Sequence, residues 1–210
     1  MSQIKERPIL FSAPMVCAIL EGRKTVTRRQ AKAQPRSRAD IGSYGKGQPF
    51  IRNPDVTKRN PECPFGKSGE RLWVRETWYC DHSEVMTGPY LKPENLDISE
   101  ARDDGTLVYA ADGLTPYETD QPVWKPSIHM PRWACRILLE ITDVRVERLQ
   151  DISEEQAMAE GVGIEAIESF RATGVDRPAG FAFRDLWTST GGDWEANPWV
   201  WVVEFKQVTP

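Results

Sequence analysis

The 210-residue chain is long enough for one domain with generous loops, and its 40% apolar residues allow a hydrophobic core and argue against wholesale disorder. It carries 27 basic and 31 acidic residues, and the resulting net charge of −4 argues against a generic polyanion-binding protein. No apolar run is long enough to cross a membrane, and residues 1–10 show neither a signal peptide nor a lipidation motif, so we expect a cytoplasmic protein without membrane contact.

The charge is unevenly distributed along the chain. Between Arg23 and Arg59, eleven Lys and Arg residues accompany two acidic residues, a local balance of +9. Between Glu84 and Asp120, nine acidic residues accompany two basic residues, a local balance of −7. The basic segment can line a phosphate track or form a solvated loop, and the sequence leaves both interpretations open.

The first predicted element is a short helix. Ser12 is its candidate N-cap, Pro14 lies in its first turn, and Gly22 follows its end. A basic and β-prone stretch over residues 23–29 comes next. We therefore expect a helix that leads through a glycine turn into a strand.

Two long polar segments separate the next predicted strands. Residues 30–62 and 81–120 lack apolar periodicity, so we expect two long loop insertions there. Between them, residues 71–78 show the composition of a strand, and residues 107–110, within the second segment, predict a short one.

The last third of the chain combines strands and helices. Residues 136–149 alternate apolar and polar side chains, which predicts one long bent strand or two short ones. Residues 153–156 form a capping box that opens a helix, and Gly161 is expected to end it. Two further helices and a closing strand are predicted over residues 164–171, 181–187 and 199–208. This order favours a single α+β domain over residues 1–210 that contains a small barrel.

Four segments resemble, in order, the ASCH domain family of the PUA-like superfamily. They are residues 22–29, 69–74, 152–161 and 201–206. Residues 125–133 are similar to phage and prophage members of this family. The resemblance implies a PUA-like small mixed β-barrel with flanking short helices, which binds RNA or a modified nucleoside in a cleft. The two insertions have no counterpart in it.

The resemblance also implies an activity. One bacterial branch consists of N4-acetylcytidine amidohydrolases, which use a lysine, a threonine three residues later and a glutamate on a helix. The matching positions here are Lys24, Thr27 and Glu160. Another branch is described as ribonucleases, in which Lys24 and Arg29 would stabilise a phosphate. A third interpretation is a non-catalytic nucleic-acid-binding module encoded by a phage or prophage.

The three matched residues can perform amide hydrolysis. Thr27 would attack, and Lys24 would accept its proton once its pKa is lowered by burial or by the neighbouring cations Arg23, Arg28 and Arg29. Glu160 is expected at the C-terminal end of its helix, where the dipole disfavours a carboxylate, so we expect it to relay a proton. Arg29 or a backbone N–H would hold the oxyanion.

The spacing of Lys24 and Thr27 sets a geometric condition. In a regular strand they would point to opposite faces, because their separation is odd. They converge only if Lys24 lies in the turn after Gly22 rather than in the strand.

Further candidate substrate-binding residues are Arg23, Arg29, Trp73, Arg75 and Glu76. A strand places Trp73 and Arg75 on one face, where they can stack on a base, although core packing is the expected role of most of the eight tryptophans. Glu76 can accept a hydrogen bond from a cytosine amino group or form a salt bridge with Arg75 or Arg71.

Other kinds of site are not indicated. The four cysteines are expected to be free thiols, and no cysteine or histidine spacing typical of a metal site occurs. The sequence has no P-loop, no Rossmann glycine pattern and no Gly-x-Ser-x-Gly elbow, so we predict neither a metal nor a cofactor. The expected partner is a modified nucleoside or RNA.

Overall fold

The computed structural model describes residues 4–113 and 124–209. These residues form an α+β fold with one five-stranded sheet and two two-stranded sheets. The strands are β1 (Glu6–Leu10), β2 (Val26–Gln30), β3 (Ile41–Ser43), β4 (Pro49–Ile51), β5 (Arg71–Arg75), β6 (Trp78–Cys80), β7 (Leu107–Tyr109), β8 (Leu138–Arg148) and β9 (Trp199–Val208). The helices are α1 (Ala13–Leu20), α2 (Ser83–Met86), α3 (Ile98–Asp103), α4 (Glu154–Ala159), α5 (Ile164–Ala172) and α6 (Pro178–Ser189).

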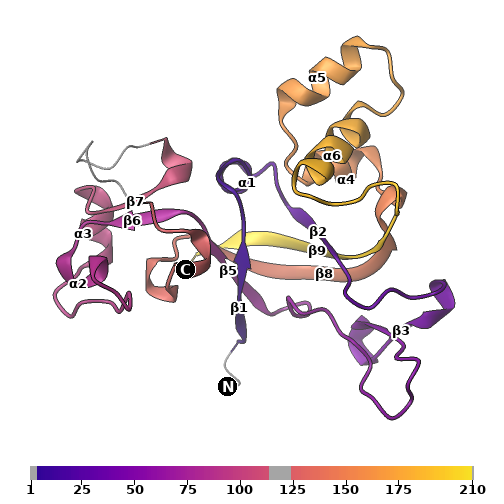
Figure 1. Ribbon diagram of the computed structural model, residues 1–210, viewed down its shortest axis with the longest axis horizontal. Coiled ribbons are helices and arrows are strands. Elements are labelled where there is room, and N and C mark those ends of the chain that lie inside the picture. The colour runs from indigo at the N-terminus through magenta and orange to yellow at the C-terminus, as the bar shows by residue number, and fades with distance from the viewer. Residues whose placement is uncertain (1–3, 114–123, 210) are drawn as a thin grey trace.

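The five-stranded sheet has the order β1-β5-β8-β9-β2. Strand β1 pairs with β5 in parallel, and the other neighbours are antiparallel. The long strands β8 and β9 run side by side through the middle of the molecule (Figure 1), with a register shift between Ile141 and Asp143. The described sheet is open, because its edge strands β1 and β2 do not pair with each other.

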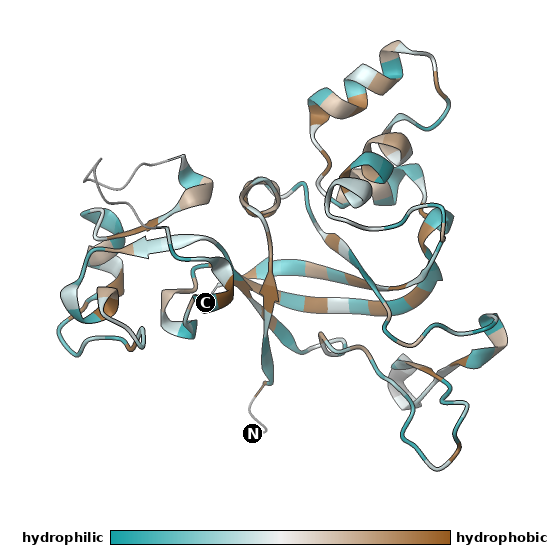
Figure 2. Ribbon diagram, in the orientation of Figure 1, coloured by the Kyte–Doolittle hydropathy of each residue, from teal (hydrophilic) through white to brown (hydrophobic). Residues whose placement is uncertain are grey.

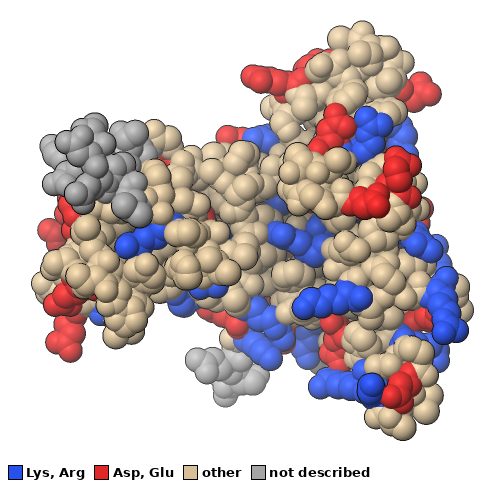
Figure 3. All heavy atoms as spheres, viewed as in Figure 1, with Lys and Arg blue, Asp and Glu red and all other residues tan. Residues whose placement is uncertain are grey.

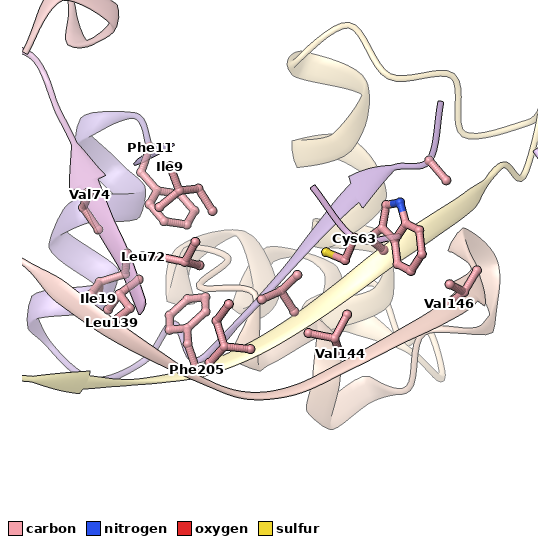
Figure 4. Close-up of a cluster of buried hydrophobic side chains, with 14 of the residues drawn as sticks. Ile9, Phe11, Ile19, Cys63, Leu72, Val74, Leu139, Val144, Val146 and Phe205 are labelled. Atoms are coloured by element: carbon pink, nitrogen blue, oxygen red, sulfur yellow. The ribbon is translucent and has the colours of Figure 1, made fainter. Parts of the chain in front are cut away.

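Strand β9 is buried on both faces. Trp201, Val203 and Phe205 belong to a cluster with α1, β1 and β5, part of which Figure 4 shows. Val200 and Val202, on the other face, pack against α4, α5 and α6. Burial on both faces explains the nearly continuous apolar run of this strand, seen as brown bands in Figure 2. The two faces of β9 thus belong to two different hydrophobic clusters.

The predicted elements of the last third are confirmed. The alternating stretch is the single long strand β8, bent at its register shift, and the two helices and the closing strand are α5, α6 and β9. Ser153 caps α4 by accepting a hydrogen bond from the backbone N–H of Gln156, and Gly161 follows with a φ of +79°. These elements were predictable because local capping and periodicity fix them.

The first part of the chain differs from expectation in three ways. The insertion over 30–62 contains the hairpin β3–β4. The insertion over 81–120 contains α2 and α3 in addition to the predicted short strand, which is β7, and its residues 114–120 lie outside the described part. The predicted strand over 71–78 is divided between β5 and β6, which belong to different sheets. Strand β1 was not predicted. All three depend on tertiary packing, which short-range periodicity does not report.

Described parts of the two oppositely charged segments lie at opposite ends of the molecule. The hairpin β3–β4 lies at one end and β6, β7, α2 and α3 at the other (Figure 1). On the face shown in Figure 3, basic side chains gather over the β2 and β3 region. No described helix has the length and apolar character needed to span a membrane.

Candidate active site

A cavity of about 410 Å³ lies against the free edge of β2, between α1 and α6. Lys24, Thr27 and Glu160 all line it, together with Arg28 and Arg29. Because β2 is an edge strand, residues from both of its faces reach the same cavity. The three predicted catalytic residues, separated by up to 136 positions in the chain, are therefore brought together.

Lys24 lies outside strand β2, just after the turn at Gly22, and forms an isolated β-bridge with Glu160. Gly22 ends α1 with a φ of +74°, and the backbone N–H groups of Arg23 and Lys24 both donate to the carbonyl of Ala18. Strand β2 begins only at Val26. The condition set by the odd spacing of Lys24 and Thr27 is thus met, since the turn frees Lys24 from the alternation of the strand.

The ammonium group of Lys24 is buried against Glu160. Its Nζ donates to Glu160 Oε2 at 2.9 Å, to the carbonyl oxygen of Glu160 at 2.7 Å and to that of Val26 at 2.9 Å. Both side chains are nearly inaccessible, with 3% exposure for each residue. Three acceptors match the three N–H donors of an ammonium, so this geometry fits the charged form of Lys24.

Burial lowers the pKa of Lys24 below its ordinary value of 10.5, and this effect is the largest. The ionised Glu160 raises this pKa, whereas Arg29 and Arg28 lower it further. The expectation that neighbouring arginines lower the pKa of Lys24 therefore agrees with the structure, although desolvation contributes more than they do.

Arg28 was expected only as a cation that lowers the pKa of Lys24, and the structure also places it against Glu160. Its Nη1 lies 3.2 Å from Glu160 Oε1, and its Nη2 donates to Gln156 Oε1 at 2.5 Å and to Glu147 Oε2 at 3.3 Å. Gln156 precedes Glu160 by four residues, so both lie on one helix face. The spacing of Gln156 and Glu160 could have indicated that both face the same partner. Glu160 has two cationic partners, Lys24 and Arg28, whereas its position at the end of α4 had suggested only an unfavourable helix dipole.

Thr27 lies in β2 opposite Val203 and is 3% exposed. Within the described residues its hydroxyl makes no hydrogen bond, and Lys24 directs its three donors elsewhere. Thr27 and Lys24 thus share the cavity without a hydrogen bond between them. A reaction in which Lys24 takes the proton of Thr27 requires Lys24 to lose a proton first.

The other predicted substrate-binding residues separate into two groups. Arg29 lines the cavity, whereas Arg23 is not part of its lining and pairs with Glu21 at 2.5 Å. Trp73 and Arg75 do lie on one face of β5, with the guanidinium carbon 5.0 Å from the ring centre, but neither lines the cavity.

Glu76 also lies away from the cavity. It is 1% exposed and accepts two hydrogen bonds from Arg136, at 3.0 and 2.9 Å, so its partner is neither Arg75 nor Arg71. Burial raises the pKa of Glu76, and the hydrogen bonds from Arg136 oppose this effect. Its contacts are those of a structural ion pair, which Arg136 extends to Asp112 at 2.8 Å.

The wall opposite the charged residues is apolar and aromatic. Phe11 comes from the β1–α1 connection, and Phe183 and Trp187 come from α6. Gly192 closes this side, and a Cβ atom added there would lie 2.2 Å from Nε1 of Trp187. Such a wall suits a flat ring, yet no local pattern distinguished these aromatics from core residues.

Gly161 allows the turn carrying Lys24 to approach α4. Its φ of +79° favours glycine, and an added Cβ would lie 2.9 Å from the Cβ atoms of Ala18 and Lys24. We expect Gly161→Ala to lower the free energy of unfolding by about 2–4 kcal/mol. Gly22→Ala is the control, because Gly22 has a φ of +74° and open space around it. Equal losses in denaturant titrations of the two variants would contradict the close-packing argument.

No group of three or more His, Cys, Asp or Glu residues is arranged for a metal ion within residues 4–113 and 124–209. The four cysteines are free thiols, as expected.

Comparisons with known proteins give little further information. No protein-family model and no curated protein matches the chain. Among solved structures, it is similar to protein EF3133 from Enterococcus faecalis V583, described with the family DUF984, at 11% sequence identity and a TM-score of 0.39. The match covers 100% of this chain and 84% of that one. A similarity at this level carries no argument about function.

Proposed function

We propose that the protein is a hydrolase of the ASCH family that removes the acetyl group from N4-acetylcytidine or a related modified nucleoside. The observation that supports this proposal is the convergence of Lys24, Thr27 and Glu160 on one cavity, with Lys24 buried against Glu160. The cavity volume of about 410 Å³ is in the range of small-ligand sites.

The proposed reaction begins with a proton transfer inside the buried pair. When Lys24 passes a proton to Glu160, an ammonium and a carboxylate become an amine and a carboxylic acid with no change in net charge. The hydroxyl of Thr27 then attacks the acetyl carbonyl carbon, and its proton moves to the amine of Lys24. A backbone N–H at the free edge of β2, or Arg29, holds the oxyanion.

The second half of the reaction releases both products. As the C–N bond breaks, Glu160 donates its proton to the departing N4 nitrogen, and cytidine leaves with Thr27 acetylated. Water then hydrolyses the ester and releases acetate. The charged pair of Lys24 and Glu160 is then restored. In this scheme Glu160 relays the proton, which is the role expected of it from the sequence.

The PUA-like barrel remains part of this proposal. Arg29 Nη2 on β2 donates to the carbonyl of Leu10 on β1 at 2.7 Å, which links the two edge strands of the open sheet. This contact supports a curled sheet related to such a barrel.

A non-catalytic RNA-binding module is the second candidate, and the basic side chains over the β2 and β3 region in Figure 3 favour it. A protein that follows phosphates loses affinity steeply as salt rises, whereas hydrolysis of a neutral nucleoside shows little salt dependence. The salt dependence of RNA retention and of nucleoside hydrolysis therefore separates the two functions.

The test is incubation of the purified protein with N4-acetylcytidine, with cytidine followed by chromatography. In this reaction the buried pair must keep the proton that Lys24 passes to Glu160. We therefore expect the rate to fall as pH rises through the pKa of Lys24, which burial lowers below 10.5. No release of cytidine at any pH and high protein concentration would refute the amidohydrolase assignment.

A further inference from the structure

The charges that line the cavity do not balance. Lys24 pairs with Glu160, and Arg28 pairs with both Glu160 and Glu147. Arg29 forms no salt bridge with any described carboxylate. The charged side chains that line the cavity are thus three cations, Lys24, Arg28 and Arg29, and the carboxylate of Glu160, and Arg29 is the cation without a salt bridge.

The guanidinium of Arg29 is positioned but incompletely satisfied. Its carbon lies 5.3 Å from the centre of the Phe11 ring, and Nη2 donates to the carbonyl of Leu10 at 2.7 Å. Its Nε is buried and has no hydrogen-bond partner. Burial lowers the pKa of Arg29, and the charge of Glu160, which forms no salt bridge with it, partly opposes this effect. A cation in this condition is stabilised by a hydrogen-bonded anion.

The oxyanion of the proposed reaction cannot serve as the anion that stabilises Arg29. It exists only near the transition state, so it cannot offset a permanent charge while the substrate is merely bound. A phosphate on the substrate can, because its oxygens match the fork of N–H donors on a guanidinium. The backbone N–H groups at the edge of β2 then remain for the oxyanion.

We infer that the substrate is a nucleotide and that Arg29 binds its phosphate. This inference rests on the proposed function, since the cytosine and its acetyl group are assigned by that function, but the phosphate is assigned by the unpaired Arg29 at the cavity. Arg29 is then the residue that distinguishes a nucleotide from the corresponding nucleoside.

The direct test is calorimetric titration with cytidine, cytidine 5′-monophosphate and inorganic phosphate, which requires no catalysis. For the wild type we expect the monophosphate to bind about 10- to 100-fold more tightly than cytidine, the effect of a charge-assisted hydrogen-bonded pair. In Arg29→Gln this ratio should fall to about one, and in Arg29→Lys it should keep an intermediate value. The control is Arg171→Gln, an exposed arginine on α5 that pairs with Glu168.

Three results would overturn the inference: equal binding of cytidine and its monophosphate, a ratio unaffected by Arg29→Gln, or no binding of the monophosphate and phosphate at all. If Arg29→Gln does not fold, the affinity ratio of the monophosphate to cytidine in the wild type and in Arg29→Lys still tests the inference. Arg29-dependent binding of the monophosphate without hydrolysis of N4-acetylcytidine 5′-monophosphate would remove the proposed function and keep the phosphate site. A cytidine-containing trinucleotide distinguishes a free nucleotide from a nucleotide within a strand.

Discussion

Replacement of Lys24 by alanine is expected to lower kcat/KM for N4-acetylcytidine by about 10³-fold, the size of a general-base contribution. The buried Nζ contacts Glu160 at 2.9 Å, and no other described lysine lines the cavity. The measurement is cytidine release followed by chromatography. Lys67→Ala is the matched control, because Lys67 is exposed in a turn.

Two variants at Thr27 separate a nucleophile from a passive wall residue. Thr27→Val keeps the shape and removes the hydroxyl, so it should be as inactive as Lys24→Ala, whereas Thr27→Ser should retain measurable activity. A Lys24→Ala protein with more than about a tenth of wild-type activity would contradict the general-base assignment. An active Thr27→Val would contradict the covalent mechanism and leave attack by water.

Replacement of Glu160 by glutamine is expected to lower the free energy of unfolding by about 3–5 kcal/mol. Glu160 is the shared counter-charge of two buried cations, Lys24 at 2.9 Å and Arg28 at 3.2 Å. Without it, both cations remain buried, and only Arg28 keeps another carboxylate, that of Glu147. The midpoint of chemical denaturation measures the loss.

Glu155→Gln is the control for this experiment, because Glu155 lies exposed on the same helix α4. Its replacement should change stability by less than about 0.5 kcal/mol. A Glu160→Gln protein as stable as Glu155→Gln would show that the two cations are not held by Glu160 in solution. The ion pair would then not be the structural basis of the site.

The α+β class and much of the C-terminal third followed from local signals. Ser153, Gln156 and Gly161 form a start and a stop of a helix that depend only on neighbouring backbone groups. The turn at Gly22, on which the convergence of Lys24 and Thr27 depends, was also predictable, because few residues other than glycine adopt its backbone angle.

The ion pairs of the chain were not predictable in the same way. Glu76 was expected beside a neighbouring arginine, but its partner is Arg136, 60 positions away. Trp73 and Arg75 share a strand face as expected, yet that face does not reach the cavity. Periodicity specifies which face of a strand a residue occupies, and only the packing of distant strands specifies what that face meets.

The sequence by itself determined the local elements that carry Lys24, Thr27 and Glu160. These are the turn at Gly22, the strand that follows it and the capped helix that ends at Gly161. Only the tertiary structure decided that these side chains share one cavity, that Arg28 joins them, and that Arg29 is left without a carboxylate. The physical reason is the range of the interactions. Backbone conformation is set by near neighbours, whereas burial, ion pairing and cavity shape are set by residues that are far apart in the chain.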